Sequence, residues 1–213
     1  MMARSITSTP TPPLSPLNQS QNTYNRLLTM KNQPQFIWIL TGPAGCGKST
    51  LGEYLANSMK VPYIEGDEFH PKANVEKMAH GIPLMDADRW DWLVSLRETS
   101  LDYLAVGHQA VVLSCSALKR KYRDVMRVAQ FYSKKVIVHF FYLDAPEDVL
   151  LARVQARKGH YMGVNMVHSQ LTILELPEKD ETDVSRVDIN RSLEKIQEEL
   201  LTDISILTLK QVT

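Results

Sequence analysis

Residues 42–50 read Gly-Pro-Ala-Gly-Cys-Gly-Lys-Ser-Thr and fit the pattern G-x-x-x-x-G-K-[ST], which constrains the fold more than any other stretch of this chain. Glycines allow positive φ angles, so several backbone N–H groups can turn inward and form a nest that binds anions. Lys48 adds a mobile positive charge for the β- and γ-phosphates of a nucleotide, and the Ser49 hydroxyl can bind Mg²⁺. We therefore expect this phosphate loop to bind ATP, with Ser49 as a Mg²⁺ ligand; its residues are Gly42, Pro43, Ala44, Gly45, Cys46, Gly47, Lys48, Ser49 and Thr50.

The segments on either side of the phosphate loop have the character that such a loop requires. Residues 36–40 form an apolar run, Phe-Ile-Trp-Ile-Leu, which predicts a buried parallel strand. Residues 50–56 predict a helix whose N-terminus would face the phosphates and favour their negative charge. The alternative, a glycine-rich turn with an incidental lysine, does not account for this order of strand, loop and helix.

Charge and cysteine content exclude several classes of protein. The 24 Lys and Arg residues balance the 24 Asp and Glu residues, so no overall field favours nucleic acid or an anionic membrane, and an anionic ligand must be held by local charge. No apolar run approaches the roughly 18 residues of a membrane helix. Cys46 and Cys115 have neither metal-ligand spacing nor the pattern of a disulfide framework, which favours a reducing, cytoplasmic setting.

Residues 1–35 differ in composition from the rest of the chain. Prolines occur there among Ser, Thr, Asn and Gln, with little that is apolar, and we expect a disordered tail followed by one domain over residues 36–213. The tail contains Arg4, Arg26 and Lys31 and no acidic residue, as an organelle transit peptide does. Its prolines argue against the amphipathic helix that such peptides form, and the sequence alone leaves the role of the tail open.

Apolar runs and helical patterns alternate along the domain. Strands are predicted at residues 36–40, 61–65, 110–113, 136–143 and 184–189. Helices are predicted at residues 50–56, at 72–80, from 86 or 88 to 106, from 146 onward and at 193–201. This alternation predicts an α/β fold of the P-loop NTPase type: a three-layer αβα sandwich around a mostly parallel five-stranded sheet, with residues 72–106 as a helical insert on the substrate side.

Several blocks outside the phosphate loop carry a resemblance to a known family. They are Gly66 to Pro71, Asn74 to Met78, Gly81 to Leu84 followed by Asp88 to Trp90, Cys115 to Lys119 with Tyr122 to Asp124, and Ala156 to His160. Together with the loop, these blocks resemble the gluconokinase family, relatives of shikimate kinase and adenylate kinase, from about residue 37 to about residue 200. Several blocks in the right order are more specific than the loop, which indicates only a nucleotide phosphate.

The resemblance implies an enzyme that uses ATP and Mg²⁺ to phosphorylate the C6 hydroxyl of D-gluconate, giving 6-phosphogluconate and ADP for the pentose phosphate pathway. Asp67, at the carboxyl edge of the predicted sheet, would hydrogen-bond the acceptor hydroxyl and could take its proton; the alternatives are a Mg²⁺ contact through water and a helix cap. Arg89 would bind the substrate carboxylate bidentately, unless it pairs with Asp86 or Asp88. The family also suggests a homodimer.

Three more residues would contact the substrate if the resemblance holds: His70, Lys119 and Arg123. A histidine beside a proline is, however, often only a structural hydrogen-bonding group. Lys119 and Arg123 follow the third predicted strand and could face either the substrate or the γ-phosphate. Residues 85–88, Met-Asp-Ala-Asp, are less polar than the family pattern, which leaves a detail of the substrate contact open.

A mobile lid is also implied by the resemblance. Arg157 would act in catalysis, together with Lys48 and Asp67, by closing over ATP and stabilising the charge of the transferred group. His160 would reach the substrate from the same segment. Arg153 would share the contact with ATP, or would only cover the surface of its helix.

Two other functions are compatible with the phosphate loop. A kinase of the same architecture could act on shikimate, a nucleoside monophosphate or another sugar acid. A nucleotide-dependent switch or binding module would hydrolyse ATP slowly without an acceptor, but the blocks around Asp67 and Arg89 would then have no evident purpose. Activity against a panel of acceptors separates these hypotheses.

Replacing Lys48 by alanine is expected to cost several kcal/mol of transition-state stabilisation, because it removes a charge that follows the migrating phosphate. The measurement is kcat/KM for phosphate transfer. Wild-type turnover in this variant would contradict the role of Lys48.

Overall fold

The computed structural model describes residues 33–156 and 164–212 of the chain. The predicted tail, residues 1–35, therefore lies outside the described residues except for its last three positions, and so do the predicted lid residues Arg157 and His160. The described part contains one five-stranded sheet in the order β2-β3-β1-β4-β5, and every strand pair is parallel. The strands are β1 (Gln35–Thr41), β2 (Tyr63–Glu65), β3 (Ala110–Ser114), β4 (Val136–Asp144) and β5 (Val184–Asp188).

Helices connect the strands, as a parallel sheet requires. They are α2 (Lys48–Met59), α3 (Lys72–Ala79), α4 (Trp90–Ala105), α5 (Arg120–Arg127), α6 (Ala129–Tyr132), α7 (Glu147–Ala156), α8 (Val164–Thr172) and α9 (Leu193–Val212), with the short 3₁₀ turns η1 (Gly66–Phe69) and η2 (Asp86–Asp88). Within the described ranges, none of these helices is long and apolar enough to cross a membrane.

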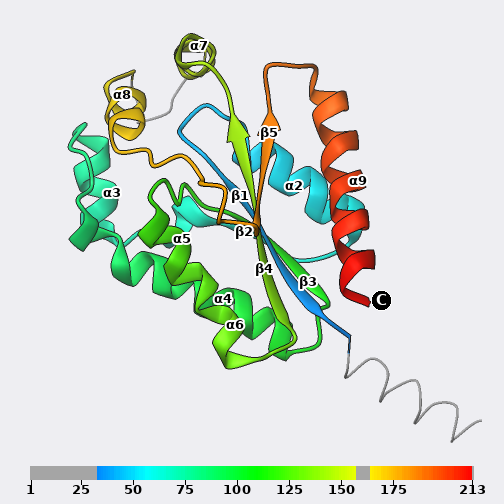
Figure 1. Ribbon diagram of the computed structural model, residues 1–213. Coiled ribbons are helices and arrows are strands. Elements are labelled where there is room, and N and C mark those ends of the chain that lie inside the picture. The colour runs from blue at the N-terminus through cyan, green and yellow to red at the C-terminus, as the bar shows by residue number, and fades with distance from the viewer. Residues whose placement is uncertain (1–32, 157–163, 213) are drawn as a thin grey trace, which may run out of the picture. The chain divides into compact units, whose positions relative to one another are not determined.

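The alternation of side chains along β1 explains why both faces of the sheet are covered. Successive residues of a strand point to opposite faces. Phe36, Trp38 and Leu40 pack with residues of α2 and α9, while Ile37 and Ile39 pack with residues of α4 and α5. Figure 1 shows the resulting three layers, with α2 and α9 on one side of the sheet and α4, α5 and α6 on the other. The predicted α/β sandwich is confirmed, and the sheet is wholly parallel rather than mostly parallel.

The structure differs from the predicted elements mainly in its C-terminal half. The closing helix continues to Val212 instead of ending near residue 201, because Ile204 extends its buried face beyond Leu200. Helix α8 was not predicted. Its residues mix apolar and polar types without a capping signal, although Val167 is fully buried in the core.

Hydrogen bonds tie the carboxyl ends of the three strands on the β2 side of the sheet to one another. The Ser114 hydroxyl donates to Glu65 Oε1 at 2.5 Å, and the Thr41 hydroxyl donates to the carbonyl oxygen of Ser116 at 2.7 Å. The chain leaves β2 at Gly66. This glycine packs so closely on β3 that an added Cβ would lie 2.1 Å from the carbonyl oxygen of Ser114. The two neighbours of this glycine, Glu65 and Asp67, are thereby held against the sheet edge.

The variant Gly66→Ala is expected to lose about 3 kcal/mol or more of stability, because the neighbouring atom is backbone and cannot rotate away. Urea unfolding measures the loss. Gly81→Ala is the matched control, since a Cβ at Gly81 meets nothing within 4 Å and pays only for its φ angle of 70°. Its cost should be about 1 kcal/mol. Equal losses in the two variants would contradict the close packing at Gly66.

Candidate active site

A cavity of about 170 Å³ opens at the carboxyl edge of the sheet, between the phosphate loop and the helical insert. We call it the central cavity. Six separate parts of the chain contribute to its wall, at the edge where the strands of an open α/β sheet end. Its lining residues are Ala44, Gly45, Gly47, Lys48 and Ser49 from the loop and the start of α2, Asp67 and His70 after β2, Met78, Leu84 and Arg89 from the insert, and Ser116, Val154, Met166 and Gln170.

The phosphate loop has the backbone geometry of an anion-binding nest. Gly45 and Gly47 have φ angles of 84° and 92°, in the left-handed region that favours glycine. Gly47 is also the N-cap of α2, so the positive end of the helix dipole meets the loop. Lys48 Nζ lies 2.9 Å from the carbonyl oxygen of Gly42 and 3.0 Å from that of Pro43, and therefore folds back over the loop. The predicted cradle for phosphate is present in the fold.

Glu65 lies beside Ser49, the predicted Mg²⁺ ligand. Glu65 itself was not predicted from the sequence as a site residue. Its carboxylate accepts hydrogen bonds from the hydroxyls of Ser114 and Tyr63, and the nearby Ser49 hydroxyl also lowers its pKa. Burial alone raises the pKa of Glu65, but these hydrogen bonds outweigh burial and hold the pKa below its ordinary value. An ionised carboxylate thus stands next to the Ser49 hydroxyl. Its position in the sequence could have indicated this role, because Glu65 is the last residue of β2 and directly precedes the Gly66-Asp67 pair from which Asp67 was predicted.

Within the described ranges, no group of three or more His, Cys, Asp and Glu side chains could hold a metal ion by itself. The oxygen donors at Ser49 and Glu65 nevertheless suit a hard cation that takes its remaining ligands from phosphate and water, as Mg²⁺ does. The site therefore fits a metal that arrives with the nucleotide.

Two polar side chains that line the central cavity opposite the phosphate loop have nitrogen atoms without a hydrogen-bond partner among the described residues. His70 Nδ1 and Arg89 Nε are buried and have no hydrogen-bond partner among the described residues. His70 stacks on Trp92 with ring centroids 4.2 Å apart. Burial, and then the charge of Arg89, lower the pKa of His70 to about 4, so the ring is neutral near pH 7. Buried polar atoms without partners carry a cost in free energy, and a bound polar ligand would relieve it.

Arg89 is 4% exposed and does not form the ion pairs that the sequence left open for it. Asp88 binds Lys77 at 2.6 Å, and Asp86 binds Lys119 at 2.9 Å and also contacts Lys121 and Tyr122. The Arg89 guanidinium lies over the ring of Tyr122, and among the residues that the structure describes it makes one long hydrogen bond, 3.5 Å, to the carbonyl oxygen of Leu84. Its charge is therefore directed at the central cavity.

Lys119, predicted as a substrate contact, is not among the residues that line the central cavity. Its ammonium group binds Asp86 of η2 and lies 5.7 Å from the centre of the Tyr122 ring. Asp86 thus joins the helical insert to the start of α5. The structure gives Lys119 a place in this joint rather than in the site.

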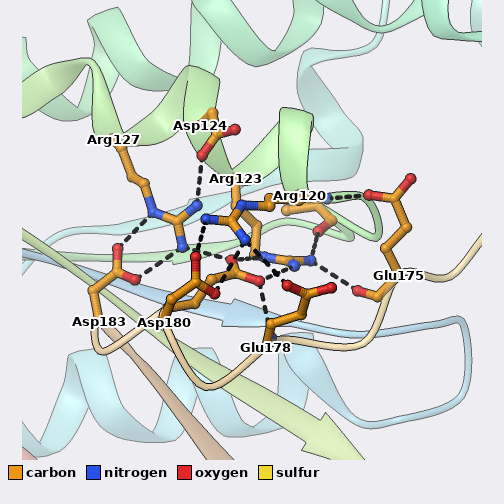
Figure 2. Close-up of polar contacts among 10 residues, drawn as sticks. Arg120, Arg123, Asp124, Arg127, Glu175, Glu178, Asp180 and Asp183 are labelled. Carbon is orange, nitrogen blue, oxygen red and sulfur yellow. Dashed lines mark hydrogen bonds and ion pairs between the residues drawn. The ribbon is translucent and has the colours of Figure 1, made fainter.

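Arg123, also predicted to contact the substrate, lies outside the lining of the central cavity and within a buried ion pair. It is 1% exposed, and its guanidinium donates two hydrogen bonds to Glu181, at 2.7 Å from Nε and 2.6 Å from Nη2. A further N–H group donates to the carbonyl oxygen of Glu175 at 3.1 Å. Figure 2 shows Arg123 within a larger set of ion pairs that connects α5 to the segment before β5, with Arg127 bound to Asp183 and Arg120 to Asp180. Arg123 therefore stabilises the fold.

Arg153 lies at a second cavity, of about 320 Å³, on the other side of the phosphate loop. The two cavities share Gly45 and Gly47, and Thr50 and Arg191 also line the second one. Arg153 Nη2 donates to the carbonyl oxygen of Ile189, 2.9 Å away, which fixes the guanidinium beside this cavity. The placement agrees with a contact to the nucleotide, whereas Arg157 and His160 fall outside the described residues.

Comparisons with known proteins agree with this geometry. Residues 37–173 match the protein family described as an AAA domain. The chain is 44% identical over 174 residues to a probable gluconokinase of Schizosaccharomyces pombe, and the match covers 80% of this chain and 89% of that protein. It is 38% identical over 162 residues to the thermosensitive gluconokinase of Escherichia coli K12, covering 76% and 83% of the two chains. The crystal structure of a gluconokinase from Sinorhizobium meliloti superimposes with a TM-score of 0.71 at 38% identity, covering 83% of this chain and 95% of the other.

The variant Glu181→Gln tests the structural role of Arg123. It leaves the buried guanidinium without a counter-charge and should lower the free energy of unfolding by about 3 kcal/mol or more. Glu178→Gln is the control, because Glu178 is 74% exposed in its ion pair with Arg120 and should contribute little. If Glu181→Gln left stability unchanged and weakened substrate binding instead, Arg123 would have to be returned to the site.

The same ion pair predicts a dependence of stability on pH. Burial of Glu181 raises its pKa, but hydrogen bonds from Arg123 and Arg127 outweigh burial and lower the pKa from 4.5 to about 2. The folded state therefore binds the proton more weakly than the unfolded state, so the stabilisation is present above about pH 4.5 and is lost as the pH falls toward 2. Urea unfolding over this range should show a steeper loss for the wild type than for Glu181→Gln.

Proposed function

The chain belongs to the gluconokinase family, and we propose that it transfers the γ-phosphate of ATP to the C6 hydroxyl of D-gluconate, giving 6-phospho-D-gluconate and ADP. The observation that carries the proposal is the arrangement of the central cavity. Lys48 and Ser49 stand on its donor side, and Asp67 and Arg89 stand on its acceptor side. A phosphate cradle, an acidic group and a buried cation in one small cavity suit a hydroxy acid as acceptor.

On the donor side, the phosphate loop would hold the β- and γ-phosphates of ATP through its inward-turned N–H groups. Ser49 would bind Mg²⁺ directly and Glu65 would bind it through water; the ion would neutralise charge on the phosphate oxygens. The second cavity, with Arg153 at its wall, would take the nucleoside part of ATP. Lys48 leaves the loop carbonyls and follows the transferred phosphoryl group.

On the acceptor side, the Arg89 guanidinium would bind the gluconate carboxylate as a bidentate pair. Its burial strengthens the preference for an anion, because the charge has little water around it. His70 is neutral near pH 7 and would hydrogen-bond a hydroxyl of the sugar acid without adding charge. With the carboxylate held by Arg89, the far end of the extended substrate would point its C6 hydroxyl toward the phosphate loop.

Asp67 would orient that hydroxyl and accept its proton as the reaction proceeds. The C6 oxygen then forms a bond to the γ-phosphorus, the bond between that phosphorus and the oxygen bridging to the β-phosphate breaks, and ADP leaves. Arg157, predicted to stabilise charge on the transferred group, keeps that role as part of the proposal. Holding donor and acceptor in one cavity favours transfer to the sugar acid over transfer to water.

A coupled assay for ADP production tests the proposal. D-gluconate is compared with other sugar acids, shikimate and nucleoside monophosphates at equal concentration, and D-gluconate should give the highest kcat/KM. If the enzyme phosphorylated a nucleoside monophosphate and did not phosphorylate gluconate, the proposed acceptor would be wrong. ATP hydrolysis that gluconate does not stimulate would favour a nucleotide-dependent switch.

The variant Arg89→Lys isolates the carboxylate contact. An ammonium keeps the charge but cannot form the planar, bidentate pair, so the KM for gluconate should rise by about tenfold or more while the KM for ATP stays within about twofold. The two KM values come from the same assay. An unchanged KM for gluconate would refute the assignment of Arg89 to the carboxylate.

A further inference from the structure

Helix α8 touches both sides of the central cavity. Met166 packs with Met78 and Leu84 in an apolar cluster of the helical insert. Gln170 lies one helical turn further on, and both residues also line the cavity. Residues four apart lie on the same face of a helix. In Figure 1, α8 lies close to α3 of the insert. One face of α8 is therefore directed at the site, and Gln170 is its polar member.

Gln170 makes a direct contact with the phosphate loop. The backbone N–H of Ala44 donates to Gln170 Oε1 at 2.6 Å, and both groups are buried. The two residues are 126 positions apart in the chain. Because a backbone N–H can only donate, the facing atom of the Gln170 amide is its oxygen. The contact is thus a true hydrogen bond that ties the loop to α8.

The position of Ala44 gives this bond its importance. Ala44 directly precedes Gly45, a glycine of the nest whose φ angle of 84° lies in the left-handed region. A buried N–H group needs an acceptor, and without one the local backbone shifts toward another partner or toward water. Such a shift at Ala44 would turn the neighbouring N–H groups of the loop away from the positions that phosphate oxygens need.

We propose that Gln170 is a positioning residue of the donor site, which holds the phosphate loop ready for the nucleotide by accepting the Ala44 N–H. It acts through the loop and not on the acceptor. The inference rests on the proposed function only for the identity of the nucleotide, and binding can be measured with no acceptor present. A failure of gluconate turnover would therefore leave the test of Gln170 intact.

The test uses Gln170→Met in the full chain, because methionine is similar in length and unbranched but offers no strong acceptor. Isothermal titration with ADP and Mg²⁺, and with a non-hydrolysable ATP analogue and Mg²⁺, should show a Kd raised by about tenfold, the effect of one buried donor left unpaired. The KM for gluconate should stay within about twofold. Amide exchange measured by NMR should be faster at Ala44 than in the wild type.

A second variant, Gln170→Glu, restores an oxygen for Ala44 and keeps the test decisive if the methionine variant does not fold. Slow amide exchange at Ala44 should return in it, while the added negative charge repels phosphate and keeps nucleotide affinity low. Fast exchange at Ala44 in this variant would overturn the proposal.

The control is Val167→Ala on the same helix. Val167 is fully buried in the cluster that includes Ala44 but lines neither of the two cavities, so its truncation should destabilise the fold and change nucleotide Kd much less than Gln170→Met does. The proposal is overturned if Val167→Ala weakens nucleotide binding as much as Gln170→Met does. It is overturned equally if Gln170→Met binds ADP as the wild type does, or if the KM for gluconate rises in parallel.

Discussion

The hydrogen bonds between the carboxyl ends of β1, β2 and β3 hold the two sides of the site at a fixed separation. A parallel sheet brings these strand ends to one edge, but it does not by itself prevent them from fraying. Ser114 binds Glu65 and Thr41 binds the carbonyl of Ser116, so each strand end has a partner on another segment. The phosphate loop follows β1, and Asp67 follows β2. Their relative position is therefore set by backbone that cannot move independently.

Some buried polar and charged residues of this chain line the candidate site, whereas others stabilise the fold, and the residue type alone does not distinguish the two roles. Arg89 and His70 line the central cavity and each has a buried nitrogen that finds no hydrogen-bond partner in the described part of the chain. Arg123 instead donates its hydrogen bonds to Glu181 and to the carbonyl oxygen of Glu175. A buried ion pair is costly to desolvate, and it becomes favourable only when its geometry and remaining hydrogen bonds are satisfied. Glu181 meets that condition by accepting from both Arg123 and Arg127. In this protein, the buried charged group whose hydrogen bonds are satisfied within the fold stabilises the structure. The buried polar groups with unsatisfied nitrogen atoms are the candidates for binding a ligand.

Local patterns explain which parts could be predicted from the sequence. The strand, phosphate loop and first helix are contiguous, and their residue types determine their conformation, so they were predicted with the α/β fold. Asp67 and Arg89, predicted as site residues from contiguous blocks of the sequence, both line the central cavity. The ion pair of Arg123 could not be predicted, because its partner Glu181 is 58 positions away. Gln170 carried no signal, since one glutamine in an unpredicted helix gains meaning only when the fold brings it to Ala44, 126 positions earlier.

The two groups of ion pairs also differ in their exposure to solvent ions. Each partner of the Arg123–Glu181 pair is 2% exposed, while Asp86 and Lys121 are 36% and 47% exposed where the insert meets α5. Dissolved salt weakens the attraction between exposed charges, with a Debye length of about 10 Å at 0.1 M, and affects buried pairs much less. An increase in ionic strength should therefore weaken the Asp86–Lys121 pair between the helical insert and α5 more than the buried Arg123–Glu181 pair. Salt concentration is thus a means of weakening this one attachment of the insert while the buried pair stays formed.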